Sequence, residues 1–155
     1  MSRFIQVMEA AAKDPFANMT KGKYGDLSKG YMIEFFGKSY KGELYVESPK
    51  DDYVITDKQR KMLADFEKNK ARYSKQVFKA LLAYINKLRD YKDYFDDHDI
   101  PKTEQDIGDI VKPKYIIIHR EENLVMDCDA KWDPEHGVSI QIIPSVRCGG
   151  SGDFY

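Results

Sequence analysis

The feature that most constrains the fold is the hexapeptide Trp132-Asp133-Pro134-Glu135-His136-Gly137, which separates two alternating apolar runs. The apolar positions are Leu124, Met126 and Cys128 before it, and Val138, Ile140 and Ile142 after it. Such alternation is typical of half-buried strands. Asp133 can accept the N–H two residues on, Pro134 presets φ at the first central position, and Gly137 can adopt a positive φ. The pattern predicts a hairpin closed by a type I turn with a glycine bulge, with Trp132 in the core beneath it.

Helix and strand patterns succeed one another in the N-terminal third. Apolar residues at helical spacing predict a short helix that ends before Asp14-Pro15; they are Phe4, Val7, Met8 and Ala11. Residues 18–30 are polar and punctuated by glycine, which predicts a surface loop. The β-rich runs 32–36 and 40–46 flank Gly37-Lys38, a pair compatible with a two-residue type II′ turn. These runs predict a first hairpin.

Helical signals dominate the middle of the chain. Thr56-Asp57-Lys58-Gln59 has the form of a capping box and predicts a helix from Asp57. An apolar stripe of period near 3.6 runs from there to Leu88, with a polar interruption at Asn69-Lys70. This pattern predicts either one long helix that bends or two helices that meet near Ser74, which could cap the second. The run ends within residues 96–101.

The C-terminal third reads as a brief helix followed by a β-meander. Thr103-Glu104-Gln105-Asp106 predicts the helix, which Pro113 stops, and strands are expected at residues 115–119, 124–128 and 138–143. Gly149-Gly150-Ser151-Gly152 predicts a mobile turn. The expected fold is α+β, an antiparallel sheet of about five strands with one long or two consecutive helices on one face. We expect one domain over 1–155, with an N-terminal helix and loop over 1–27 and a core over 28–155.

Charge and cysteine content exclude several classes of function. The net charge of −1 comes from 25 basic and 26 acidic residues, so no broad field attracts nucleic acid or an anionic membrane. Two cysteines are too few for a disulfide framework, which favours a reduced, cytoplasmic protein. An acidic residue, Glu9, interrupts the start before a signal-peptide core could form, and no segment is apolar enough to span a membrane.

Two constellations invite an enzymatic interpretation. Glu135 and His136 could form a general acid and base pair, but adjacent residues in a turn tend to point apart, so we interpret both as solvated. A metal site could be drawn from five residues, His119, Asp127, Cys128, Asp129 and His136, but Asp127 and Cys128 alternate across a strand and cannot share a face, and no spacing is that of a zinc motif. Cys128 reads as an inert core residue. We therefore expect no catalytic residue, metal or cofactor.

Aromatic and acidic residues gather where the long helical run ends. The chain has 11 tyrosines and 8 phenylalanines, more than a core of this size needs. Aromatic side chains can anchor a protein partner while acidic ones steer a basic partner toward the surface. The candidate partner-binding residues are Tyr91, Tyr94, Phe95, Asp96, Asp97 and Asp99.

The order of these motifs resembles a group of small bacterial domains of uncharacterised function. The resemblance spans about residues 28 to 155 and rests on Phe35-Phe36-Gly37-Lys38, Pro113-Lys114-Tyr115-Ile116, Asp127-Cys128 and the hexapeptide with Val138. This chain departs from the pattern in having Ala130 and Lys131 before Trp132. Members of this and similar groups are presumed immunity proteins of polymorphic toxin systems, so the resemblance implies a protein partner, a cognate toxin encoded nearby, and assigns no catalytic residue.

Three hypotheses follow. The first is a non-enzymatic domain that binds and neutralises a bacterial toxin. The second is a small hydrolase or metal-dependent enzyme that uses Glu135 and His136 in a shared cleft. The third is a homo-oligomeric module joined through an exposed sheet edge. The sequence leaves the identity of the partner, the binding face and the oligomeric state open.

Overall fold

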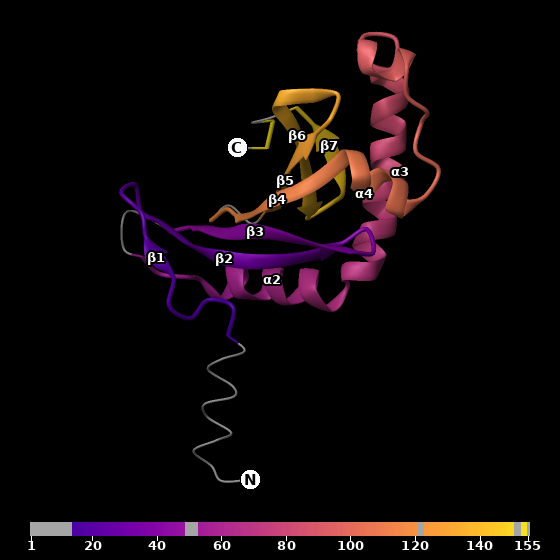
Figure 1. The fold of residues 1–155 in the computed structure, drawn as a ribbon. Helices are drawn as coiled ribbons and strands as arrows, with labels where there is room; N and C mark the ends of the chain where they lie inside the picture. The colour runs from indigo at the N-terminus through magenta and orange to yellow at the C-terminus, as the bar shows by residue number, and fades with distance from the viewer. Residues whose placement is uncertain (1–13, 49–52, 121–122, 151–152, 155) are drawn as a thin grey trace.

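Three helices pack against one open seven-stranded sheet in the computed structural model, which describes residues 14–48, 53–120, 123–150 and 153–154 (Figure 1). The strands are β1 (Thr20–Lys21), β2 (Asp26–Phe35), β3 (Lys38–Glu47), β4 (Val111–Ile118), β5 (Leu124–Ala130), β6 (Asp133–Ile143) and β7 (Arg147–Gly149). The helices are α2 (Asp57–Lys68), α3 (Lys70–Leu88) and α4 (Glu104–Ile110). The predicted α+β class is confirmed. The predicted N-terminal helix at residues 4–11 lies outside the described residues.

The strands lie in the sheet in their order along the chain. Every neighbouring pair is antiparallel except β3 and β4, which pair in parallel from Glu43 with Tyr115 to Val46 with Ile118. A parallel pair needs a long crossover, and the three helices supply it. The crossover therefore joins the first hairpin to the C-terminal meander within one sheet.

The first hairpin is longer than the sequence predicted. Strand β2 begins at Asp26, so the prediction of a loop over 18–30 is wrong. The polar pattern misled because much of β2 stays accessible to solvent, whereas Leu27 is buried. The turn consists of Phe36 and Gly37, with φ of +53° and +71°. Positive φ at both central positions defines a type I′ turn, which replaces the predicted type II′ turn at Gly37-Lys38.

Helix α2 begins at Asp57, as the capping box predicted. The Thr56 hydroxyl accepts the Gln59 N–H at 3.1 Å, and the Gln59 side-chain oxygen accepts the Thr56 N–H at 3.0 Å. The Gln59 amide also donates to the Glu47 carbonyl at 2.7 Å and to the Ile118 carbonyl at 3.3 Å. One side chain therefore caps the helix and ties its start to the ends of β3 and β4.

Two helices, rather than one bent helix, follow the capping box. They meet at Asn69, which is the C-cap residue of α2 and the N-cap residue of α3. The polar interruption in the sequence therefore marks the junction of the two helices. Ser74 lies buried within α3 and does not cap it. The helix ends at Leu88, before the predicted stop, and the 3-10 helix η2 (Asp93–Asp96) follows.

The meander also departs from the predicted limits. Thr103 caps α4 as predicted, by accepting the Asp106 N–H at 3.0 Å, but the helix ends at Ile110. Pro113 lies within β4, at a register shift against β5, where a missing N–H is tolerated. Strand β7, Arg147–Gly149, replaces part of the turn predicted at Gly149, and residues 151–152 lie outside the description.

A single core cluster fills the space between helices and sheet. Helix α2 lies along one side of β2 and β3, and α3 stands beside the C-terminal strands (Figure 1). Fully buried members include Ile33, Leu44, Phe66, Leu81 and Ile116. The opposite side of β2 and β3 carries no helix in the described part of the chain (Figure 1). No described helix is long and apolar enough to cross a membrane.

Candidate functional site

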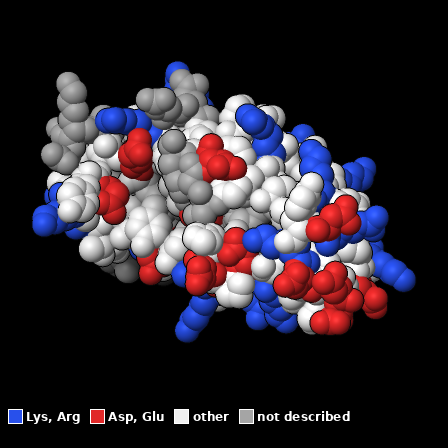
Figure 2. Space-filling view, turned by 90° about the horizontal axis from the view of Figure 1, so that it is seen from above, with Lys and Arg blue, Asp and Glu red and all other residues white. Residues whose placement is uncertain are grey.

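The segment that follows α3, residues 89–99, contains all six residues predicted to bind a partner, and we call it the acidic-aromatic segment. It extends α3 beyond the level of the sheet (Figure 1). Tyr91 is 82% exposed. The five aspartates of the segment are also exposed; they are Asp90, Asp93, Asp96, Asp97 and Asp99. Seen from above, acidic side chains gather at the end of the molecule where α3 lies, with basic side chains around them (Figure 2).

Two predicted binding residues form the base of the segment instead of its outer surface. Tyr94 and Phe95 are half-buried, with ring centroids 5.2 Å apart and the rings edge to face. Phe95 also packs on Trp132, at 5.8 Å between centroids. The Tyr94 ring stacks on His98 at 4.0 Å, and burial raises the pKa of the Tyr94 hydroxyl. These contacts hold the backbone that presents Tyr91 and the aspartates.

The hexapeptide lies directly beside this segment. Ala130 pairs with Asp133, so the chain reverses at Lys131 and Trp132, earlier than the predicted turn. The residues from Pro134 to Gly137 form an irregular stretch of β6 that bulges from the pairing with β5. Proline fits such a bulge because its missing N–H is not needed for pairing. The buried position of Trp132 and the positive φ of Gly137, +69°, agree with the prediction.

Asp133 organises the bulge. Its carboxylate accepts the His136 N–H at 3.3 Å and lies 3.2 Å from the His136 Nδ1. Partial burial opposes ionisation, but the hydrogen bonds from His136 and the nearby Lys92 ammonium, at 3.9 Å, keep the pKa of Asp133 below its usual value. Glu135 is exposed, and the His136 side chain is 67% exposed. The imidazole is therefore directed to Asp133, and Lys92 links the bulge to the acidic-aromatic segment.

Three of the other residues considered as metal ligands have contacts or burial that do not involve the bulge. His119 contacts Glu47 at 3.3 Å, and Asp127 accepts the Ser139 hydroxyl at 2.6 Å. Cys128 is buried, and burial raises the pKa of its thiol well above the usual value. Within the described residues, no group of three or more acidic, histidine or cysteine side chains is arranged to hold a metal ion.

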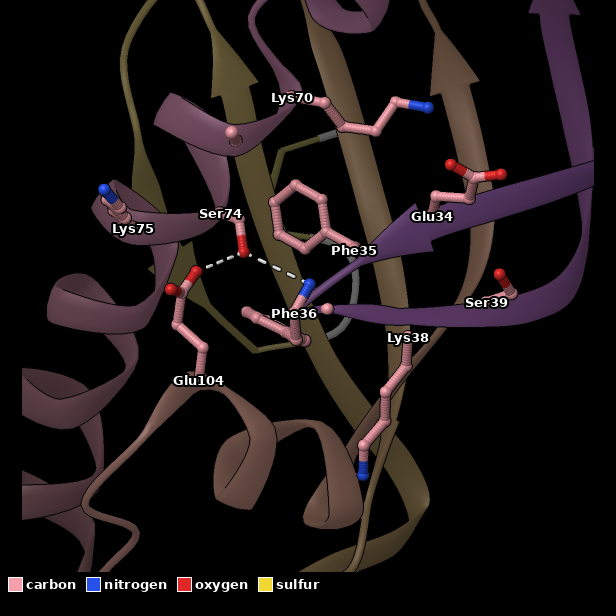
Figure 3. Close-up of a pocket in the computed structure, with 11 residues that line it drawn as sticks. Glu34, Phe35, Phe36, Lys38, Ser39, Lys70, Ser74, Lys75 and Glu104 are labelled. Carbon is pink, nitrogen blue, oxygen red and sulfur yellow. Dashed lines mark hydrogen bonds between the residues drawn. The ribbon is translucent and has the colours of Figure 1, made fainter.

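A further pocket, of about 450 Å³, opens where the first hairpin meets α3 and α4 (Figure 3). At its centre the Ser74 hydroxyl donates to Glu104 at 2.5 Å and accepts the Phe36 N–H at 3.1 Å. Phe36 has a positive φ, which its buried ring and this hydrogen bond stabilise. No local sequence pattern predicts this cluster, because the partners of Ser74 are 38 and 30 residues away.

The Ser74 cluster joins three elements of the fold. Figure 3 shows the Lys75 amino group directed away from the Ser74 hydroxyl, as expected for adjacent residues on a helix. Both sides of the hydroxyl are occupied by the Phe36 N–H and the Glu104 carboxylate. Its hydrogen bonds therefore connect the tip of the hairpin to α3 and α4.

The comparisons with known proteins identify a family but no activity. The family model described as Domain of unknown function (DUF6985) matches residues 15–145. The comparisons with curated proteins and with solved structures gave no match. The function must therefore be argued from the geometry of this chain.

Proposed function

This chain belongs to the family of the Domain of unknown function (DUF6985), and we propose that it is a protein-binding domain whose acidic-aromatic segment binds a basic protein. The observation that carries the proposal is the combination of exposed charge and buried support in residues 89–99. Five exposed aspartates and Tyr91 project from a base formed by Phe95 on Trp132. A rigid base lowers the entropy cost of presenting these groups to a partner.

Charge gives the segment its expected partner. Arg89 and Lys92 are its basic residues, against five aspartates, so the local charge is negative although the chain as a whole is nearly neutral. Complementary charge raises the association rate of two proteins and disfavours partners of the same sign. Tyr91 supplies an amphipathic ring with few rotatable bonds, which suits the centre of an interface.

The specific form we propose is neutralisation of a bacterial toxin with a basic surface. The sequence resemblance to presumed immunity proteins supports this role. An exposed acidic surface with an aromatic side chain also suits the binding of a basic toxin. A basic active-site surface, such as one that binds nucleic acid, would be complementary to the segment. Binding there would exclude the substrate of the toxin.

The proposal is tested with the products of the genes adjacent to the one that encodes this chain. Each product is co-expressed with the wild-type chain, and survival of the host and co-purification are measured. For a product that binds, the affinity of the triple variant Asp96→Asn, Asp97→Asn, Asp99→Asn and of Tyr91→Ala is measured by calorimetry. We expect a loss of about tenfold or more in each, about 1.4 kcal/mol, with a slower association rate in the triple variant.

A control comes from a second exposed apolar side chain. Val54 is 53% exposed and Tyr91 is 82% exposed, so replacing either with alanine has little effect on folding. Val54 does not belong to the acidic-aromatic segment, and Val54→Ala is expected to leave the affinity for the toxin unchanged. If both the triple variant and Tyr91→Ala bind and protect as the wild type does, the proposed binding surface is wrong.

A further inference from the structure

A second hollow lies on the side of β2 and β3 that carries no described helix. Its volume is about 510 Å³, and its lining includes Tyr24, Tyr45 and Tyr115 together with Asp26, Glu47 and Asp127. Within the described part of the chain, no lysine or arginine lines it. Figure 2 views β2 and β3 from the side opposite α2, and acidic side chains stand there among uncharged and basic ones. The hollow thus combines aromatic rings with negative charge.

The register of the strands brings these side chains together. Asp26 pairs with Glu47 across β2 and β3, and Tyr115 pairs with Asp127 across β4 and β5. The rings of Tyr45 and Tyr115 meet edge to face, at 5.4 Å between centroids and 75° between planes. Side chains directly opposite each other in a sheet share one face, so both carboxylate and ring pairs open on the same side.

The carboxylates leave a place for a positive group. Asp26 and Glu47 carry like charges in directly opposite positions, an arrangement that destabilises a strand pair. Arg120 approaches one oxygen of Glu47 at 3.3 Å and offsets part of its charge, and the His119 ring contacts the other oxygen at 3.3 Å. Neither residue lines the hollow, and a cation placed inside would be attracted by Asp26 as well as by Glu47.

The rings already attract ammonium groups of the chain itself. The Nζ atom of Lys23 lies over the Tyr24 ring, 5.7 Å from its centroid, and the Nζ atom of Lys114 lies 5.1 Å from the centroid of Tyr115. Both lysines reach the rings from outside the lining. A cation over an aromatic face within about 6 Å gains electrostatic energy, more so when it is desolvated. These contacts indicate the class of ligand that the rings favour.

We propose that this hollow binds one cationic side chain, an arginine or a lysine, presented by a partner polypeptide. The rings contact the planar or aliphatic part of that side chain, and Asp26, Glu47 and Asp127 accept its N–H groups. The inference rests on residues separate from the acidic-aromatic segment and does not depend on the proposed toxin partner. It assigns a ligand class to a face that the first proposal leaves unused.

The test uses four labelled pentapeptides, Gly-Ser-Xaa-Ser-Gly with blocked ends and Arg, Lys, Gln or Glu at the centre. Each is titrated into the full-length chain while the tyrosine ring signals are followed by NMR. We expect saturable binding of the Arg and Lys peptides that weakens with salt, and at least about tenfold weaker binding of the Gln and Glu peptides.

Three variants locate the binding. Tyr24→Ala and Asp26→Asn are expected to weaken binding of the Arg peptide about fivefold or more, whereas Glu135→Gln, at an exposed carboxylate outside both surfaces, leaves its affinity unchanged. Asp26→Asn also removes the repulsion from Glu47, so its urea midpoint without peptide equals or exceeds that of the wild type. A loss of affinity with a normal midpoint therefore reports the site and not the fold.

The acidic-aromatic segment is the competing location for a basic peptide. If neutralising Asp96, Asp97 and Asp99 abolishes binding while Tyr24→Ala and Asp26→Asn do not, the hollow is not the site. Equal affinity for the Arg and Gln peptides also overturns the proposal. Failure of the toxin experiments leaves these measurements unaffected, because they use the chain and peptides alone.

Discussion

Replacing Gly137 with alanine tests whether the bulge within the hexapeptide is structural. The φ of Gly137 is +69°, and a Cβ atom added there would lie 2.1 Å from the Cys128 carbonyl oxygen. A left-handed conformation costs a residue with a side chain about 1–2 kcal/mol. The contact involves backbone, so β5 and β6 must separate, and overpacking of this kind costs about 1–3 kcal/mol. We therefore expect Gly137→Ala to lower the free energy of unfolding by about 2–5 kcal/mol.

Gly30→Ala is the matched control for this change. Gly30 lies in β2, and a Cβ atom added there meets nothing within 4 Å. Because glycine in a strand is less stable than alanine, Gly30→Ala should be neutral or stabilise by up to about 1 kcal/mol. Urea denaturation measures the free energy of unfolding of both variants, provided that its dependence on urea concentration has the same slope as in the wild type. If Gly137→Ala falls within about 0.5 kcal/mol of the wild type, the derivation from φ and the carbonyl contact is refuted.

Three further predictions concern the same elements. Trp132→Ala should cost about 3–5 kcal/mol in urea denaturation because it empties a buried site, and a variant as stable as the wild type would contradict that burial. Ser74→Ala should cost about 1–3 kcal/mol because the Phe36 N–H loses its buried acceptor and Glu104 loses a donor; an unchanged urea midpoint would argue against this link. The pKa of Asp133 lies below its usual 3.8, so its ionised form stabilises the fold at neutral pH and this contribution disappears as pH falls through that range. The stability difference between the wild type and Asp133→Asn should therefore shrink below pH 4, and a difference independent of pH would contradict it.

Short-range signals predicted elements well because their energetics are local. The capping box at Thr56 joins groups three residues apart, and it placed the first residue of α2 correctly. Thr103 placed the start of α4 in the same way. By contrast, the polar half of β2 resembled a loop because a strand with one accessible face lacks a continuous apolar run. The structure identifies this segment as a strand by its pairing with β3, which begins with Asp26 opposite Glu47.

Long-range contacts explain what the sequence could not predict. The parallel pairing of β3 with β4 depends on a crossover of three helices, and no local pattern in either strand specifies it. Ser74 looked like a helix cap because serine favours that position, yet its hydroxyl bonds groups on two other elements. The run of aromatic and acidic residues over 89–99 is evident in the sequence, but the role of Phe95 as a support depends on its contact with Trp132.

The contact between Phe95 and Trp132 also decides how the hexapeptide relates to the proposed binding surface. The hexapeptide contributes a buried ring to Phe95 and a carboxylate to Lys92, so it supports residues 89–99 from below. Groups that act through such a support change binding by displacing the segment, and their effects should appear in stability and affinity together. Tyr91 and the exposed aspartates have few contacts to lose, so their effects should appear in affinity alone. The ratio of the loss of affinity to the loss of stability therefore distinguishes residues that support the segment from residues that contact the partner.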